Sequence, residues 1–182
     1  MFDDKRSKKI IFVAHCILNQ NSKVNRCAHY SGAIEEITKI LIEAGIGIVQ
    51  MPCPELLYLG LDRKTDKSID STIESEDTRI SSLMNEESAK AFCRNLASDI
   101  IKQIIDYKNN GFRVIAVVGI NGSPTCGVET GWKDNKGTDK PGVFIQLLIE
   151  ELDEYDASIP FAGIKASEPG KASTLVKKLI SN

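Results

Sequence analysis

The chain has 182 residues, a length that a single domain with one hydrophobic core accommodates. Lysine and arginine number 23 against 25 for aspartate and glutamate, which disfavours a nucleic-acid partner and leaves a small molecule as the expected one. No apolar stretch is long enough for a signal peptide or a membrane span, so we expect no membrane partner and a cytoplasmic location.

The apolar pattern predicts strands that alternate with helices along the chain. Compact apolar runs typical of strands buried on both faces cover Ile10–Ala14, Ile46–Met51, Val114–Val118 and Phe161–Ile164. Apolar residues at helical spacing predict helices over 31–44, 89–107, 143–148 and from Pro169 onward. Gly45 and Gly111 stand where the first two of these helices are expected to end.

This alternation predicts one α/β domain over residues 1–182. The expected architecture is a three-layer, Rossmann-like α/β/α arrangement around a mostly parallel sheet of about four to five strands. Residues 62–87 are polar and charged with little periodicity, which indicates an excursion from the pattern and a candidate lid. Ligands of open parallel sheets bind beyond the carboxyl ends of the strands, so we expect the site at that edge.

Three of the five cysteines follow predicted strands. Cys16, Cys53 and Cys126 each come shortly after a strand end, and three thiolates suffice to hold a 4Fe-4S cluster with one iron left open. A disulfide framework is a poor explanation because cytosolic thiols stay reduced. Cys93 belongs to the apolar face of a helix and is expected in the core, whereas Cys27 is expected to be a solvated loop thiol.

Zinc is the alternative inorganic ligand. A Cys₃His set is a common tetrahedral zinc site, and His15 adjoins Cys16. The chain contains no CxxC pair, and the three thiols are dispersed over more than half of its length, which is unusual for structural zinc. We expect His15 and His29 to be structural histidines with satisfied hydrogen bonds.

Three short segments resemble the signature of the thiouracil desulfidase family. They are HCILN at 15–19, PCPE at 52–55 and GSPTCG at 122–127, and GTDKPGVF at 137–144 is similar to a helix entry found there. The resemblance extends from about Ile10 to Leu148. The stretch HCILNQNSKVN departs from the leucine-glycine and arginine-tyrosine-aspartate pattern of that family, so thiouracil itself is not assigned as the substrate.

The resemblance implies a role for each matching residue. In that family three cysteines hold a 4Fe-4S cluster, and the matching positions are Cys16, Cys53 and Cys126. The matching catalytic residues are Glu55 and Ser123. Each has a plainer alternative, because Glu55 could be a solvated carboxylate and Ser123 before a proline could be a helix cap.

Other residues near the predicted site are weaker candidates. Arg63 could hold a polar edge of the substrate, although a solvated arginine is the default expectation. Trp132 and Tyr58 could stack on a flat heterocycle, although packing is the plainer interpretation of both.

The expected function is therefore a non-redox desulfidase that uses a 4Fe-4S cluster to remove sulfur, as sulfide, from a small thiolated compound by hydrolysis. Glu55 is the expected general base and, later in the reaction, the expected proton donor, and Ser123 is expected to hydrogen-bond the substrate or its developing charge. The alternatives are a non-catalytic iron–sulfur or zinc protein, a sulfur-transfer enzyme, and a nucleotide-processing enzyme with incidental cysteines. The sequence leaves the strand order and the oligomeric state open.

Overall fold

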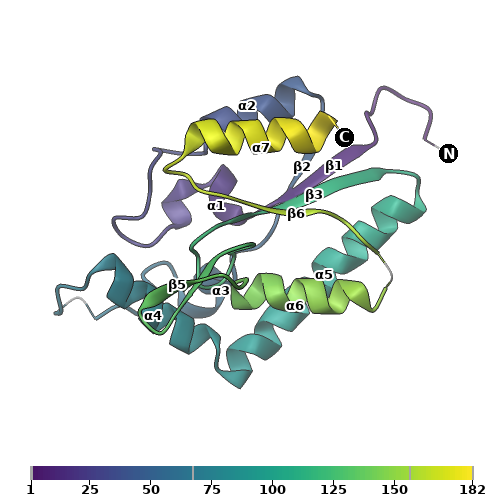
Figure 1. Cartoon of the computed structure of the whole chain (residues 1–182). Helices are drawn as coiled ribbons and strands as arrows, with labels where there is room; N and C mark the ends of the chain where they lie inside the picture. The colour runs from purple at the N-terminus through teal and green to yellow at the C-terminus, as the bar shows by residue number, and fades with distance from the viewer. Residues whose placement is uncertain (1, 67, 156, 182) are drawn as a thin grey trace.

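A four-stranded parallel sheet forms the centre of the computed structural model, which describes residues 2–66, 68–155 and 157–181 (Figure 1). Its strands, in spatial order, are β2 (Gly47–Gln50), β1 (Lys9–Val13), β3 (Arg113–Ile120) and β6 (Phe161–Ile164). A separate antiparallel hairpin consists of β4 (Gly131–Lys133) and β5 (Lys136–Thr138). The predicted mostly parallel α/β architecture is confirmed.

Helices cover both faces of the sheet. The helices α2 (Glu35–Glu43) and α7 (Pro169–Ser181) lie on one face, and α5 (Glu87–Asn109) and α6 (Val143–Asp153) lie on the other (Figure 1). The inner strand β3 is buried from its second residue onward because it has a strand on each side and helices above and below. Gly45 and Gly111 adopt φ values of +65° and +77° just after α2 and α5, as their predicted role at helix ends requires.

The periodicity does not predict three short elements that follow the strands. They are α1 (His15–Leu18), the 3₁₀ turn η1 (Gln20–Ser22) and α3 (Pro54–Leu59). An apolar stripe needs about three turns to become visible in a sequence, and each of these elements is shorter than two turns.

The polar excursion at 62–87 contains a regular helix, α4 (Ile73–Met84). The side chain of Thr72 caps its start by accepting a hydrogen bond from the Ser75 amide at 3.2 Å. The β4–β5 hairpin holds α4 through two hydrogen bonds of 2.9 Å, from Trp132 Nε1 to Thr78 Oγ1 and from Ser81 Oγ to the Trp132 carbonyl. The excursion is therefore docked on the body of the domain.

No helix within the described ranges combines the length and the apolar character that crossing a membrane requires.

Two isoleucines of α2 test the packing of the sheet face. Ile37 is fully buried, whereas 64% of Ile42 is exposed. We expect Ile37→Ala to lower the free energy of unfolding in urea by about 2–5 kcal/mol, because it leaves a cavity in the core. Ile42→Ala is the matched control on the same helix and should change that free energy by no more than about 0.5 kcal/mol. Equal effects of the two substitutions would contradict this packing.

Candidate functional site

The three thiols predicted at strand ends line one cavity. This cavity has a volume of about 300 Å³ and is lined by Cys16, Cys53 and Cys126 together with Glu55 and Ser123. Cys16 lies in α1 after β1, Cys53 lies between β2 and α3, and Cys126 lies in the loop after β3. The cavity therefore lies at the carboxyl ends of three neighbouring parallel strands, the edge at which sheets of this type bind ligands.

Gln20 fixes the segment that carries Cys16. Its amide nitrogen donates a hydrogen bond of 2.6 Å to the Cys16 carbonyl, and its amide oxygen accepts one of 3.0 Å from the His29 backbone. The side chain is only 1% exposed, so both bonds are shielded from water. The sequence gives no signal for this role, because a glutamine in a polar connection usually faces solvent.

The PCPE segment combines the end of a strand with the start of a helix. Cys53 precedes the first residue of α3, and Pro54 occupies that first position, where its fixed φ and missing amide proton are favourable. Glu55 follows in the first turn and is only 9% exposed. The plain alternative of a solvated loop carboxylate is therefore wrong for Glu55.

Ser123 shapes the loop that carries Cys126. Its hydroxyl oxygen accepts hydrogen bonds from the amides of Cys126 at 3.0 Å and Thr125 at 3.2 Å. The loop folds back on β3, where the Ile120 amide donates to the Cys126 carbonyl, and a side chain on Gly119 would overlap that carbonyl. The alternative of a cap for a helix starting at Pro124 is wrong, because these amides belong to a tight turn.

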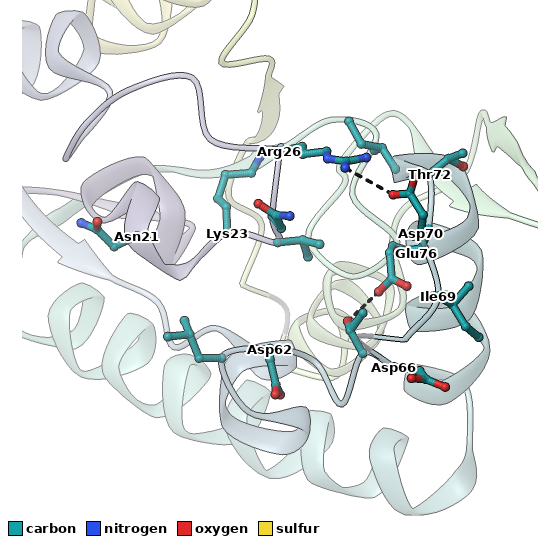
Figure 2. A pocket seen from close by; sticks show the side chains of 15 residues that line it. Asn21, Lys23, Arg26, Asp62, Asp66, Ile69, Asp70, Thr72 and Glu76 are labelled. Carbon is teal, nitrogen blue, oxygen red and sulfur yellow. Dashed lines mark hydrogen bonds and ion pairs between the residues drawn. The ribbon is translucent and has the colours of Figure 1, made fainter.

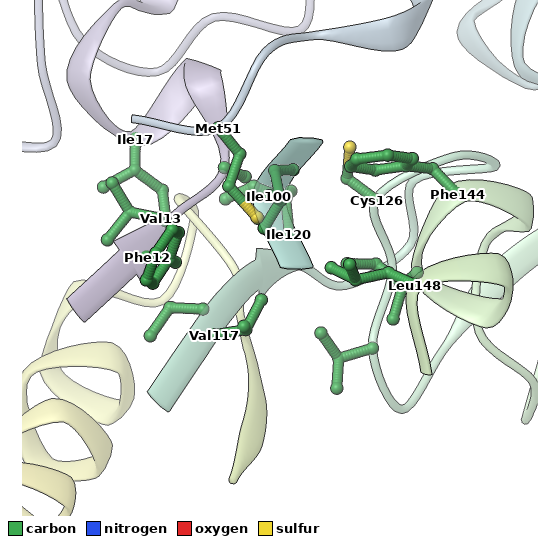
Figure 3. Close-up of a cluster of buried hydrophobic side chains, with 14 of the residues drawn as sticks. Phe12, Val13, Ile17, Met51, Ile100, Val117, Ile120, Cys126, Phe144 and Leu148 are labelled. Atoms are coloured by element: carbon green, nitrogen blue, oxygen red, sulfur yellow. The ribbon is translucent and has the colours of Figure 1, made fainter. Parts of the chain in front are cut away.

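The start of α6 supports the same loop. The amides of Val143 and Phe144 each donate a hydrogen bond of 3.1 Å, to the carbonyls of Pro124 and Thr125 respectively. Gly142 leaves no room for a side chain against the Thr125 backbone. The helix entry at 137–144 thus positions the SPTCG segment. Figure 3 draws Cys126 in the same buried cluster as Phe144.

A buried arginine connects the segments around the cavity. Arg63 is 1% exposed, so the expectation of a solvated arginine is wrong. It forms an ion pair with Glu55, Nε to Oε2, at 3.4 Å. Its other donors contact the carbonyl oxygens of Ser22 at 2.6 Å, Gly60 at 2.9 Å and Leu61 at 3.0 Å, and Cys53 Sγ at 3.8 Å. One guanidinium thereby fixes the segments that follow both Cys16 and Cys53.

Burial keeps the cavity thiols protonated in the metal-free protein. Desolvation, reinforced by the charge of Glu55, raises the pKa of Cys53 to about 12, and the Arg63 charge opposes this shift. Burial also raises the pKa of Cys16, and it raises that of Cys126 well above the usual range. A metal or cluster would have to displace these protons, because thiolates are the ligating form.

The remaining cysteines and the histidines depart in part from expectation. Cys93 is fully buried in the core, as predicted. Cys27 is only partly exposed to solvent, and it lines the thiol cavity. His15 Nε2 is buried without a hydrogen-bond partner among the described residues, and burial lowers the His15 pKa, so the imidazole is neutral and unsatisfied. His29 is exposed.

A larger cleft of about 910 Å³ adjoins the thiol cavity (Figure 2). The two share the lining residues Lys23, Val24, Arg26 and Ile73. An ion pair of 3.3 Å between Arg26 and Asp70 joins the segment after η1 to the 62–87 segment across the cleft. The predicted lid segment therefore forms one wall of this cleft.

Asp77 is a cavity residue that the sequence does not reveal. It extends from α4 and lines the thiol cavity with Glu55. In the sequence it is one of many acidic residues in a charged segment, so no pattern separates it from the others. The two candidate aromatic residues do not line the cavity, because Tyr58 donates a hydrogen bond of 2.8 Å to Ser88 and Trp132 packs on α4.

The chain is similar to the uncharacterized protein MJ0003 of Methanocaldococcus jannaschii. The two are 38% identical over 123 residues, which is 68% of this chain and 70% of the archaeal protein. No family model matches the chain. No solved structure matches it either.

The Arg63 network predicts a large stability difference between two arginine variants. Arg63→Met leaves Glu55 and three carbonyl groups without their buried donor, so we expect the free energy of unfolding in urea to fall by about 3–5 kcal/mol. Arg26→Met is the matched control, because the exposed Arg26–Asp70 pair contributes only about 0–1 kcal/mol. A small, equal effect of both substitutions would show that Arg63 does not organise the site.

Proposed function

The chain belongs to the family of the archaeal protein MJ0003, and we propose that it is a desulfidase that depends on a 4Fe-4S cluster. It would convert the thiocarbonyl group of a small compound to a carbonyl group and release sulfide. One observation carries this proposal: Cys16, Cys53 and Cys126 come from three separate segments and line one cavity together with Glu55.

We propose a cluster, and not a single zinc ion, as the occupant of the cavity. No group of three histidine, cysteine or acidic side chains in the described part of the chain is arranged to hold a single metal ion. In a cluster each thiolate binds a different iron, so the thiols surround a volume. The cationic Arg63 guanidinium, 3.8 Å from Cys53 Sγ, is well placed to offset the negative charge of bound thiolates.

The cluster would supply a Lewis-acidic iron that binds sulfur and makes the thiocarbonyl carbon more electrophilic. The protein would supply the proton transfers. Glu55 is oriented by its ion pair with Arg63 and would take a proton from the attacking water. Ser123 accepts two backbone hydrogen bonds, and its own O–H has no acceptor within the described ranges, so it can donate to the substrate.

The size of the cavity supports a small substrate. A volume of about 300 Å³ is at the lower end for small-molecule sites, and the adjoining cleft extends it toward the surface. The reaction exchanges sulfur for oxygen without net electron transfer. All five cysteines are free thiols, and we propose a cytoplasmic location, because the cytosol keeps thiols reduced.

Metal analysis of anaerobically reconstituted protein tests the cluster. We expect a brown protein with about four irons and a matching amount of sulfide per chain. Cys16→Ser, Cys53→Ser and Cys126→Ser should each lose most of this iron, because each removes one ligand. Cys93→Ser is the matched control in the core and should retain it. One tightly bound zinc ion per chain in place of iron would contradict the proposal.

Sulfide release from a thiolated heterocycle tests Glu55. We expect Glu55→Gln to slow release by about 10²–10⁴-fold, because the amide cannot accept a proton, while the iron content stays unchanged. Glu43→Gln is the control, since Glu43 is an exposed glutamate of α2 that does not line the cavity. Unchanged sulfide release in Glu55→Gln would show that this residue is not the base.

A further inference from the structure

Two neighbouring acidic residues of α4 line different cavities. Glu76 lines the large cleft and is bound there by Arg79 at 2.7 Å and Thr65 at 2.8 Å (Figure 2). Asp77 follows it and lines the thiol cavity, because successive helical residues point about 100° apart. The second carboxyl group of the thiol cavity is thus delivered by the 62–87 segment.

The Asp77 carboxyl group has no partner among the residues that the structure describes. It forms no hydrogen bond or ion pair with any residue of the described ranges, in contrast to Glu76. The charged groups that act on it are Glu55 of α3, Lys23 of the segment after η1, and Glu74 and Glu76 of its own helix. The Cys27 thiol lines the same cavity. A partly buried carboxyl group without a protein partner is free to exchange a proton with a bound molecule.

Burial, followed by the negative charge of Glu55, raises the pKa of Asp77 to about 7, while Lys23 opposes the shift. An acid with this pKa still carries its proton on a large fraction of molecules at neutral pH. The cavity therefore holds two carboxyl groups in different environments, one paired with a guanidinium and the other unpaired. Enzymes use such a pair to separate the roles of base and acid.

We propose that Asp77 is the proton donor of this site and protonates the sulfur of the substrate. The assignment rests on the desulfidase function proposed above. Glu55 takes one proton from water as the water oxygen bonds to the thiocarbonyl carbon, and the C=S π electrons move to sulfur, which receives the Asp77 proton. The C–S bond then breaks, its electron pair leaves with sulfur as hydrosulfide, and the C=O bond forms.

The protons balance over this sequence. The second proton of the water, released when the C=O bond forms, returns to Asp77. The proton held by Glu55 passes to hydrosulfide, so that thiocarbonyl and water give carbonyl and hydrogen sulfide. At the end of the reaction Asp77 is protonated and Glu55 is ionised, as both were at the start.

A carboxyl titration of the metal-free protein tests the acid directly. With carbon-13-labelled aspartate, we expect one carboxyl signal to titrate near pH 7 and to be missing in Asp77→Asn. Asp99→Asn, an exposed aspartate of α5, is the matched control and should leave that signal in place. Absence of a near-neutral aspartate signal in the wild-type protein would overturn the inference.

The pH dependence of stability gives a second readout without activity. The folded pKa of Asp77 lies above its unfolded value of 3.8, so its contribution to stability is complete below that value and is lost as pH rises through about 7. We therefore expect Asp77→Asn to gain urea resistance relative to wild type as the pH rises from about 4 to about 7. A pH-independent difference between the two proteins would count against the assignment.

Activity of the reconstituted enzyme separates this inference from the proposed function. Asp77→Asn should retain its iron and lose about 10²-fold in kcat, and it should lose the fall in kcat/KM that the wild type shows above about pH 7. Full activity with an unchanged profile in Asp77→Asn would overturn the Asp77 role alone. A reconstituted wild-type protein that releases no sulfide would overturn the desulfidase function, while the titration would still report on the Asp77 carboxyl group.

Discussion

The buried guanidinium of Arg63 is the constraint on which the cavity depends. It contacts the segments that follow Cys16 and Cys53, and a charge buried this fully is stable only when each of its donors has an acceptor. Its backbone adopts φ of +54°, in the left-handed region that a side chain disfavours, so the network also compensates for local strain. The same guanidinium pairs with Glu55 and contacts the Cys53 thiol, so one side chain both stabilises this part of the fold and positions two residues of the cavity.

Two parts of the fold line the cavity: the segments at the carboxyl edge of the sheet, and helix α4. The thiols lie directly beyond the carboxyl ends of β1, β2 and β3, and hydrogen bonds from the sheet and from the start of α6 hold the Cys126 loop. Asp77 comes from α4, which the β4–β5 hairpin holds through Trp132 and Ser81. The positions of the thiols therefore depend on the edge of the sheet and on α6, whereas the position of Asp77 depends on how α4 docks against the hairpin.

Much of the fold is predictable because its signals are local. The four strands of the main sheet and helices α2, α5, α6 and α7 each carry an apolar pattern long enough to be read, and glycine or proline marks several of their ends. The short helices that position Cys16 and Glu55 carry no such pattern. The fold also reverses two default interpretations: Arg63 is buried instead of solvated, and Ser123 caps a turn instead of a helix.

The sequence by itself determined the parallel α/β class and the trio Cys16, Cys53 and Cys126, because strand ends in a parallel sheet meet at one edge whatever the order of the strands. The motifs also placed Glu55 and Ser123 near these thiols, and both residues line the cavity. Only the tertiary structure decided that Arg63 is buried among these segments and that Asp77 joins the cavity. The physical reason is that their burial and charged neighbours arise from segments distant in sequence, and no local pattern records such contacts.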